Sequence, residues 1–142
     1  MGKRLTIGFV IILLGFAVYG YFNAVPGIED NGEDQPKIEI RPQTFDFGEV
    51  EYGQILEYTF KIRNLGNQIL EINKVATSCG CTTVQTSREK VNPQEEIELK
   101  VTYDTGAMSG TYAKGNQERI IYVKSNDPIN PQAEVTIFAY VK

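Results

Sequence analysis

The chain has 142 residues, of which 42% are hydrophobic, and a formal net charge of −4. It contains no histidine, which excludes Ser-His-Asp and Cys-His catalytic units, His-ligated zinc sites and Cys-x-x-Cys-His haem attachment within this sequence. The negative charge argues against nucleic-acid binding, because phosphate contacts need a basic patch.

An uncharged apolar run of 18 residues, Leu5 to Phe22, follows Lys3 and Arg4. As a helix this run would rise about 27 Å, close to the thickness of the hydrocarbon core of a bilayer. A cleaved signal peptide has a shorter apolar core and a small-residue cleavage motif, for which Val18-Tyr19-Gly20 is a poor match. We therefore expect residues 1–22 to form a retained transmembrane anchor, with Lys3 and Arg4 on the cytoplasmic side and the rest of the chain outside.

Residues 23–37 combine two prolines and two glycines with four acidic side chains. This composition predicts an acidic flexible linker. Residues 38–142 then form one domain, which is long enough to close a single hydrophobic core. Since the first 22 residues hold two cations and no acid, the remainder of the chain carries a net charge of −6.

Beyond the linker, apolar and polar residues alternate with the period of a half-buried strand, most clearly from Leu56 to Arg63. No helical periodicity appears after Phe22. About seven strands separated by Gly, Pro and Asn turns predict an all-β fold, an antiparallel β-sandwich. Besides Leu56–Arg63, the expected strands are Ile38–Arg41, Phe45–Val50, Ile69–Val75, Thr82–Thr86, Ile97–Tyr103, Arg119–Lys124 and Val135–Val141.

The core of this sandwich must be aliphatic and aromatic, because the sequence has no tryptophan and no widely spaced cysteine pair. The last strand is apolar on both faces, so one face builds the core and the other either meets a partner or packs under a loop. Aromatic residues expected in the core are Phe45, Phe47, Tyr58, Phe60 and Phe138.

Six motifs in order carry a family resemblance: Phe45–Val50, Phe60–Gly66, Leu70–Val75, Ser78–Thr82, Tyr103-Asp104 and Ser125–Pro128. From about Ile40 to Val141 the chain resembles the bacterial DUF1573 family and the immunoglobulin-like domains of the ASPM, SPD-2 and Hydin group. It departs at Asn92-Pro93-Gln94, where the family commonly has Pro-Gly. The resemblance implies an exported or anchored immunoglobulin-like sandwich and no established activity. The anchor would then lie in the bacterial inner membrane, with the domain in the periplasm or outside the cell.

The two cysteines of the chain, Cys79 and Cys81, are separated only by Gly80. A disulfide between them would stabilise the fold little, because closing a three-residue loop contributes only about 1.6 kcal/mol in the chain-entropy treatment. The Cα atoms of residues two apart in a strand also lie near the upper limit for a bridge, unless Gly80 adopts a backbone conformation closed to other residues. A disulfide here is therefore expected to be redox-active or incidental rather than a structural staple.

Two further interpretations of Cys79 and Cys81 remain open. Two thiolates cannot complete a zinc site without histidine, but they can hold Cu(I), with Met108 as the other available soft ligand. Alternatively, both cysteines are small side chains that fill the edge of the sandwich. Carboxylates such as Asp46, Glu49, Glu51 and Asp104 form no recognisable site, and Asn126-Asp127-Pro128 is typical of a turn.

Taken together, the sequence predicts a membrane-anchored extracytoplasmic binding or accessory module of an envelope assembly. We expect it to be non-enzymatic and without a cofactor. Its protein partner would contact the sandwich edges and the surface around Cys79 and Cys81, with no role for nucleic acid. The alternative is a thiol redox or Cu(I)-handling protein that uses Cys79 and Cys81.

Overall fold

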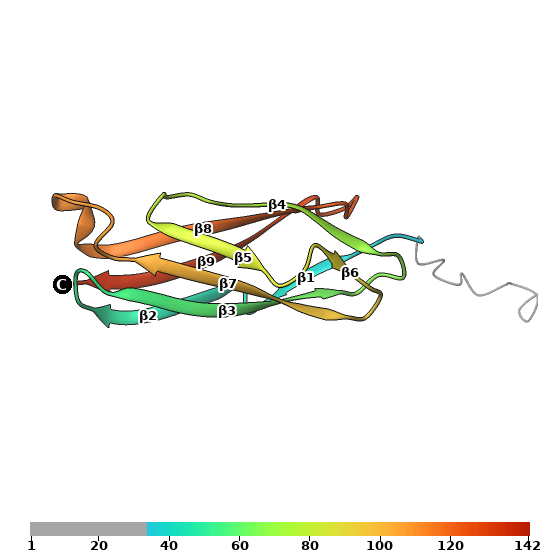
Figure 1. Cartoon of the computed structure of the whole chain (residues 1–142), viewed down its shortest axis with the longest axis horizontal. Coiled ribbons are helices and arrows are strands. Elements are labelled where there is room, and N and C mark those ends of the chain that lie inside the picture. Colours follow the sequence, from blue (N-terminus) through green and yellow to red (C-terminus); the bar gives the residue numbers. More distant parts are fainter. Residues whose placement is uncertain (1–33) are drawn as a thin grey trace, which may run out of the picture. The chain divides into compact units, whose positions relative to one another are not determined.

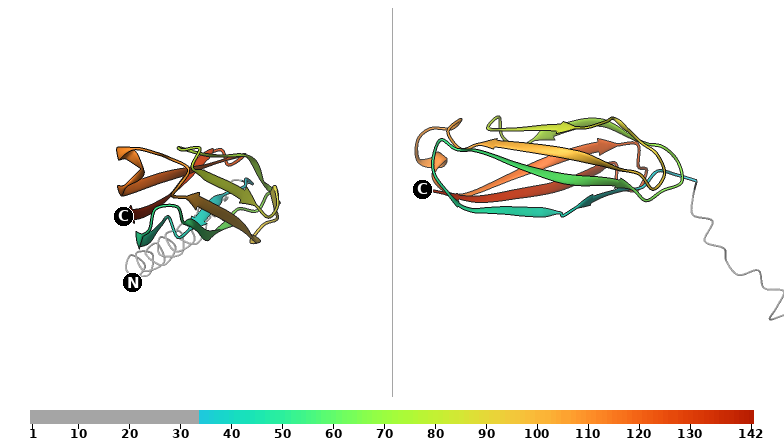
Figure 2. Two further views of the ribbon diagram at one scale, coloured as in Figure 1. Left: turned by 60° about the vertical axis from the view of Figure 1, so that its left-hand side comes forward. Right: turned by 60° about the horizontal axis from the view of Figure 1, so that its bottom comes forward.

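The computed structural model describes residues 34–142, which form a β-sandwich with one short 3-10 helix, η1 (Thr111–Ala113). Two sheets lie face to face, as the views in Figure 2 show. The strands in chain order are β1 (Ile38–Arg41), β2 (Thr44–Val50), β3 (Ile55–Asn64), β4 (Leu70–Thr77), β5 (Thr82–Thr86), β6 (Lys90–Val91), β7 (Glu96–Asp104), β8 (Gly115–Ser125) and β9 (Gln132–Val141).

One sheet has the strand order β1-β3-β7-β5 and the other the order β2-β9-β8-β4-β6 (Figure 1). The chain changes sheets at every connection except the one between β8 and β9, and two of these changes are the β4–β5 and β7–β8 connections. Both connections lie at the same end of the sandwich, where the chain after β7 also forms η1 (Figure 1). This end therefore brings two distant segments of the sequence together.

The expected all-β sandwich is confirmed, but two details of the prediction are wrong. The described residues contain nine strands, because β6 has two residues and is too short to show an alternating pattern. The sandwich is also not wholly antiparallel, since β2 runs parallel to β9, with Thr44 opposite Thr136 and Val50 opposite Val141. Alternation reveals which face of a strand is buried, but it carries no information about the direction of the neighbouring strand.

The alternating pattern assigns the core correctly along most strands. In β3, Phe60 and Ile62 are fully buried, whereas Thr59 and Arg63 are exposed. The same alternation continues in the partner strand β7, which pairs Leu99 with Phe60. The buried apolar residues of β4, β7, β8 and β9 are Leu70, Ile72, Ile97, Leu99, Val101, Tyr103, Ile121, Val123, Ala133, Val135, Ile137, Ala139 and Val141.

The expected aromatic core is correct only in part. Phe60 lies at its centre, while Phe45, Phe47 and Tyr58 pack against the core and stay partly exposed. Phe138 lies on the outer face of β9 with Tyr140, because the odd-numbered residues of that strand point inward. The prediction that Phe138 belongs to the core is therefore wrong, and the outer face of β9 is polar at its start and carries two aromatic side chains, Phe138 and Tyr140, near its end.

The residues just before β1 lie against the turn that follows β3. The backbone N–H of Gln35 donates to Asn67 Oδ1 at 3.0 Å, and the N–H of Leu65 donates to the Lys37 carbonyl oxygen at 2.8 Å. The predicted anchor at residues 1–22 and the predicted linker up to residue 33 lie outside the described residues. Within residues 34–142, no helix is long and apolar enough to span a membrane.

Candidate functional site

The Cys79-Gly80-Cys81 motif forms the turn that carries the chain from β4 in one sheet to β5 in the other. A disulfide joins the two cysteines, whose Cα atoms lie 5.2 Å apart. Residues two apart in an extended strand would lie about 6.6 Å apart, so the turn brings the pair within the ordinary range for a disulfide. The expectation of a distance near the upper limit assumed a strand, and the turn removes that assumption.

Gly80 does not adopt the left-handed conformation that the sequence analysis considered. The described glycines with positive φ are Gly48, Gly53, Gly110 and Gly115. A Cβ added to Gly80 would meet no atom within 4 Å. The backbone therefore does not require a glycine here, and an alanine would fit without a clash.

Hydrogen bonds hold this turn against β8. The backbone N–H of Ser78 donates to the Ile120 carbonyl oxygen at 2.9 Å, and the Ile120 N–H donates to Ser78 Oγ at 3.0 Å. The Thr77 hydroxyl lies 2.9 Å from the carbonyl oxygen of Cys79 and 3.0 Å from that of Thr82, so it can donate to either. The position of the disulfide is thus fixed from both sides of the turn.

The two cysteines of the disulfide have different surroundings. Cys81 is buried, with 4% of its surface exposed, and its backbone N–H donates to Cys79 Sγ at 3.0 Å. Cys79 is half-buried and borders solvent. A reagent in solution therefore reaches the sulfur of Cys79 more easily than that of Cys81.

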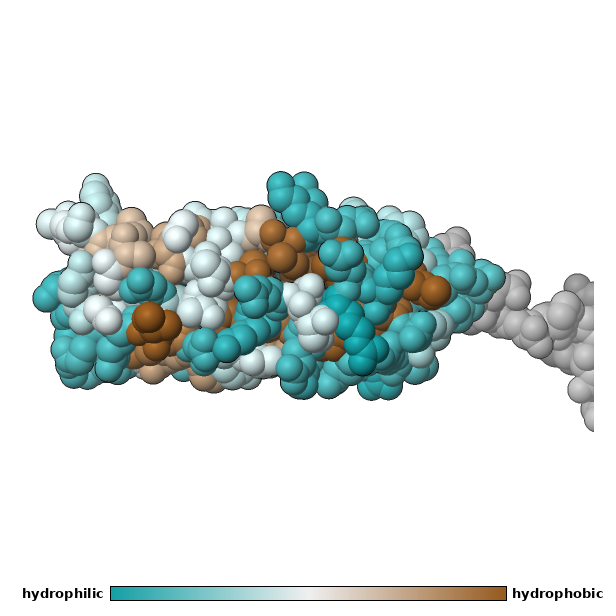
Figure 3. Space-filling model, in the orientation of Figure 1, coloured by the Kyte–Doolittle hydropathy of each residue, from teal (hydrophilic) through white to brown (hydrophobic). Residues whose placement is uncertain are grey.

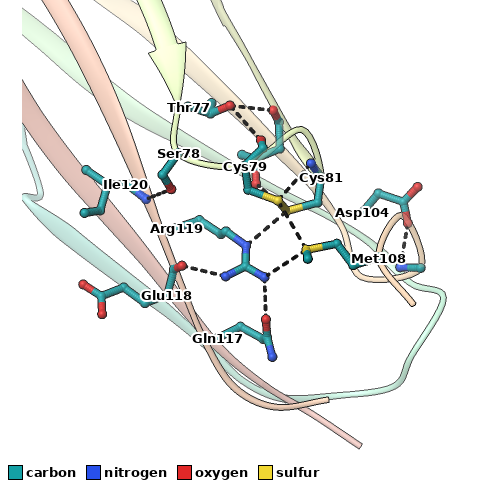
Figure 4. The surroundings of a disulfide bond; sticks show 12 residues. Thr77, Ser78, Cys79, Cys81, Asp104, Met108, Gln117, Glu118, Arg119 and Ile120 are labelled. Carbon is teal, nitrogen blue, oxygen red and sulfur yellow. Dashed lines mark hydrogen bonds between the residues drawn. A yellow bond between two sulfur atoms is a disulfide. The ribbon is translucent and has the colours of Figure 1, made fainter. Parts of the chain in front are cut away.

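Arg119 approaches the buried sulfur from the opposite sheet (Figure 4). It lies on the inner face of β8, in phase with Ile121, and its Nε donates to Cys81 Sγ at 3.1 Å. Its guanidinium carbon lies 5.4 Å from the centre of the Tyr103 ring, within the range of a cation–π contact. A positive charge is therefore held beside one sulfur of the disulfide.

The other contacts of the Arg119 guanidinium are neutral. Nη1 donates to the Glu118 carbonyl oxygen at 2.7 Å, and Nη2 donates to the Gln117 side-chain oxygen. Among residues 34–142, the ion pairs formed by the described side chains do not include Arg119. Its charge therefore remains available to an anion that forms at the sulfur.

Met108 completes a group of three sulfur-bearing residues. Its Sδ lies 3.5 Å from Cys79 Sγ and 3.8 Å from Arg119 Nη2 (Figure 4). Met108 comes from the connection between β7 and β8, so the sequence alone could not place it beside the cysteines. Of the soft ligands considered from the sequence, the structure brings together Cys79, Cys81 and Met108.

A shallow hollow of about 640 Å³ opens over the disulfide. Its charged lining residues are Lys114 and Arg119, both positive, and Tyr112 stands at its rim with 79% of its surface exposed. The remaining lining residues are Ser78, Cys79, Gly80, Met108, Thr111, Asn116 and Gln117. The hollow is thus a positive region on a domain whose net charge is negative.

Tyr103, a buried residue of β7, lies under the Arg119 guanidinium. Burial raises the pKa of its phenol, and the nearby positive charge of Arg119 opposes this rise. The net shift is upward, so the phenol stays neutral at physiological pH. Tyr103 therefore presents a neutral ring face to Arg119 and adds no competing negative charge.

The other groups of residues considered from the sequence do not come together as a reactive or metal-binding site in residues 34–142. Among residues 34–142, no three acidic, cysteine or histidine side chains are grouped as a metal site would require, and this includes Asp46, Glu49, Glu51 and Asp104. Asp127 is buried, and its carboxylate accepts hydrogen bonds from backbone N–H groups. The prediction that Asn126-Asp127-Pro128 is a structural turn is confirmed.

Sequence reasoning missed Arg119 and Gln117 as site residues. The expected strand began at Arg119, whereas β8 begins four residues earlier at Gly115. Gln117 and Arg119 are in phase with the buried Ile121 and Val123. Two polar side chains on the inner face of a strand were a usable signal that this end of the sandwich holds a polar site.

One family model and several solved structures match this chain. Residues 38–141 match the family described as a protein of unknown function, DUF1573. No curated protein matches the chain in sequence.

Solved structures share the fold at low identity. A protein of unknown function from Porphyromonas gingivalis W83 is 22% identical, with a TM-score of 0.67 over 75% of this chain and 48% of that one. The chain therefore spans about half the length of that protein. The ASH/PapD-like domain 7 of human CEP192 is 12% identical, with a TM-score of 0.56 over 77% of this chain and 87% of that one. The VesB protease of Vibrio cholerae is 12% identical, with a TM-score of 0.53 over 77% of this chain and 32% of that one. These likenesses establish an immunoglobulin-like, PapD-like sandwich.

Proposed function

Because the chain belongs to the DUF1573 family, whose description states no function, we propose a function from its own site: thiol–disulfide exchange with a protein partner through Cys79 and Cys81. The observation that carries this proposal is the 3.1 Å contact between Arg119 Nε and Cys81 Sγ. A disulfide without a chemical role needs no cation beside one of its sulfurs. A disulfide that undergoes exchange is favoured by such a cation, because exchange releases a thiolate that the cation stabilises.

The exchange begins with a thiolate of the partner at the accessible sulfur, Cys79 Sγ. A bond forms between the partner sulfur and Cys79 Sγ while the Cys79–Cys81 bond breaks, and the electron pair of that bond leaves with Cys81. Arg119 stabilises the Cys81 thiolate, and a leaving group of lower pKa departs faster. The product of this step is a mixed disulfide between Cys79 and the partner.

A second thiolate of the partner completes the reaction. It attacks the partner sulfur of the mixed disulfide, and Cys79 leaves as a thiolate. The partner dithiol has then lost two electrons and become a disulfide, while Cys79 and Cys81 have gained them. Every step exchanges one S–S bond for another, so the reaction needs no cofactor.

The short loop supports exchange rather than a structural role. A bridge across three residues constrains the unfolded chain little, and the core around Phe60 is closed by apolar side chains from both sheets. The fold can therefore keep its shape when the bridge opens.

The proposed setting is the outer side of the bacterial inner membrane. The apolar run Leu5–Phe22 with Lys3 and Arg4 before it supports a retained anchor. Disulfides form and persist mainly in oxidising compartments outside the cytosol. In this setting the acidic linker would give the domain reach towards a partner anchored in the same membrane or free in the periplasm.

A redox titration of the full-length chain in detergent tests the function. In glutathione buffers of graded ratio, mass spectrometry after alkylation should show a single two-electron transition of Cys79 and Cys81. Arg119→Gln removes the charge that stabilises the reduced form, so its midpoint should be more negative by about 30 mV or more, a tenfold change in the equilibrium constant. The matched control is Lys114→Gln, a second cation of the hollow for which no hydrogen bond to sulfur is found among the described residues. A pair that stays oxidised throughout, or equal midpoints for the wild type and Arg119→Gln, would refute the proposal.

A non-enzymatic binding or accessory role is the second candidate. It is favoured by the exposed Tyr112 at the rim of the hollow and by two aromatic side chains on the outer face of β9, Phe138 and Tyr140, which border a second hollow. On the face drawn in Figure 3, apolar side chains are scattered among hydrophilic ones and form no continuous patch. On that face (Figure 3), a partner would therefore find only small apolar areas to contact. If partner capture survives Cys79→Ser with Cys81→Ser, binding rather than exchange is the function.

A further inference from the structure

We propose that the reduced form of this site binds one Cu(I) ion through Cys79, Cys81 and Met108. The inference rests on the proposed function in one respect, because it requires that the Cys79–Cys81 disulfide can be reduced. It goes beyond exchange by assigning a metal site to the same three side chains.

The spacing of the sulfurs fits a trigonal ion. Met108 Sδ already lies 3.5 Å from Cys79 Sγ. With metal–sulfur bonds of about 2.3 Å, two sulfurs around a trigonal ion lie about 4 Å apart. Reduction breaks the bond between Cys79 and Cys81 and lets their sulfurs separate to that spacing, and the distance from Met108 Sδ to Cys79 Sγ then needs to grow by only about half an ångström.

The donor set selects a soft monovalent ion. Two thiolates and a thioether are the ligands that Cu(I) prefers, and Cu(I) accepts a coordination number below four. Zinc requires a fourth ligand, and the hollow supplies neither histidine nor a carboxylate for it. Calcium and magnesium need oxygen ligands that this group of side chains lacks.

Arg119 balances the charge of the loaded site. Two thiolates and one Cu(I) ion carry a net charge of −1. The guanidinium donates to Cys81 Sγ and lies 3.8 Å from Met108 Sδ, so it stands beside the anionic complex without occupying a ligand position. A site for a doubly charged ion would instead carry no net charge and would gain nothing from this arginine.

Reduction of the disulfide and binding of the metal are two separate steps. A phosphine in water gives two electrons to the disulfide and becomes a phosphine oxide, which leaves Cys79 and Cys81 as thiols. Cu(I) then displaces the two thiol protons and bonds to both sulfurs and to Met108 Sδ. Copper keeps its oxidation state, and no further reactant is required.

The test uses the full-length chain in detergent, reduced by a phosphine without oxygen and titrated with Cu(I) against a chromogenic chelator. We expect one Cu(I) per chain, three sulfur neighbours by X-ray absorption at the copper edge, and an affinity at least tenfold weaker in Met108→Leu. Leucine matches methionine closely in size, so packing is preserved. Cys79→Ser should lose the site.

A redox titration of the same samples separates this inference from the proposed function. If the pair is reduced and reoxidised normally in Met108→Leu while copper affinity falls, both stand. If the reduced wild type binds no copper, binds it with two sulfurs, binds half an ion per chain or binds it as tightly in Met108→Leu, the copper site is wrong and exchange is untouched. If the pair cannot be reduced at all, both are wrong.

Discussion

Arg119 Nε lies 3.1 Å from Cys81 Sγ, across the gap between β8 in one sheet and the turn that enters the other. The contact joins a charge on the inner face of a strand to the buried half of a disulfide. In the proposed exchange, the sulfur beside this cation is the one that leaves, and the sulfur that borders solvent is the one that is attacked.

The disulfide should contribute little to stability. We expect Cys79→Ser with Cys81→Ser to lower the free energy of unfolding by less than about 2 kcal/mol, because the closed loop has only three residues. Urea denaturation followed by tyrosine fluorescence measures this. A loss of about 4 kcal/mol or more would mean that the bridge holds the fold together and is not free to open.

The core should depend on Phe60. Phe60→Ala removes a fully buried ring and should lower the free energy of unfolding by about 3–5 kcal/mol. The matched control is Lys61→Ala, one residue on, which removes only an exposed 3.0 Å ion pair with Glu98 and should cost under about 1 kcal/mol. Equal losses in chemical denaturation would contradict the register of β3.

Asp127 should make stability depend on acid pH. Burial alone would raise the pKa of its carboxyl, but N–H groups of Asn130, Ile38 and Ile129 outweigh burial and hold the pKa below its ordinary value of 3.8. A carboxyl with a lowered folded pKa stabilises the protein above its unfolded pKa, and this stabilisation is lost as pH falls through the folded pKa.

Asp127→Asn tests this directly. The amide nitrogen cannot accept from the Ile38 N–H, which now donates to Oδ2 at 2.8 Å. At pH 7 the variant should unfold more easily by about 1.5–3 kcal/mol. The difference from the wild type should shrink as pH is lowered from about 5 to below the ordinary Asp pKa. A difference that is constant with pH would show that the charge of Asp127 is not what matters.

Replacement by alanine should lower stability at Gly66 and leave it almost unchanged at Gly80. A Cβ at Gly66 would lie 2.2 Å from the Gln35 carbonyl oxygen and 2.7 Å from the Lys37 nitrogen, so the segment before β1 must be displaced. We expect a loss of about 1–3 kcal/mol in Gly66→Ala, with faster tryptic cleavage after Lys37. Gly80→Ala meets no atom within 4 Å and should change stability by less than about 0.5 kcal/mol. Faster cleavage after Lys37 in Gly80→Ala, or an unchanged cleavage rate in Gly66→Ala, would contradict this packing.

Much of the fold could be predicted from the sequence, because each strand records its buried face in its own alternation. That local signal placed Phe60 and Ile62 correctly. It failed where the answer depends on a neighbour: β2 lies parallel to β9, and Phe138 lies on the outer face of β9, near whose end both faces carry apolar residues. The departure from the family pattern at Asn92-Pro93-Gln94 has a local effect. Gln94 stands where the family commonly has glycine and adopts a φ of 63°, a conformation that a glycine adopts without strain.

The site was predictable in its cysteines and not in its surroundings. Cys79 and Cys81 stand out because they are close in sequence. Met108 and Arg119 reach them from the β7–β8 connection and from β8, about 30 and 40 residues away. Such contacts depend on which connections cross at the same end of the sandwich, and no spacing in the sequence records that.

The most direct measurement is the position of the first mixed disulfide. Oxidised full-length chain is exposed briefly to reduced glutathione, quenched with acid and digested with trypsin, which releases residues 75–88 as one peptide. Fragmentation across Gly80 then locates the glutathione. The account predicts glutathione on Cys79 and a free thiol on Cys81, formed more slowly in Arg119→Gln. Glutathione on Cys81, or an equal distribution over both cysteines, would contradict it.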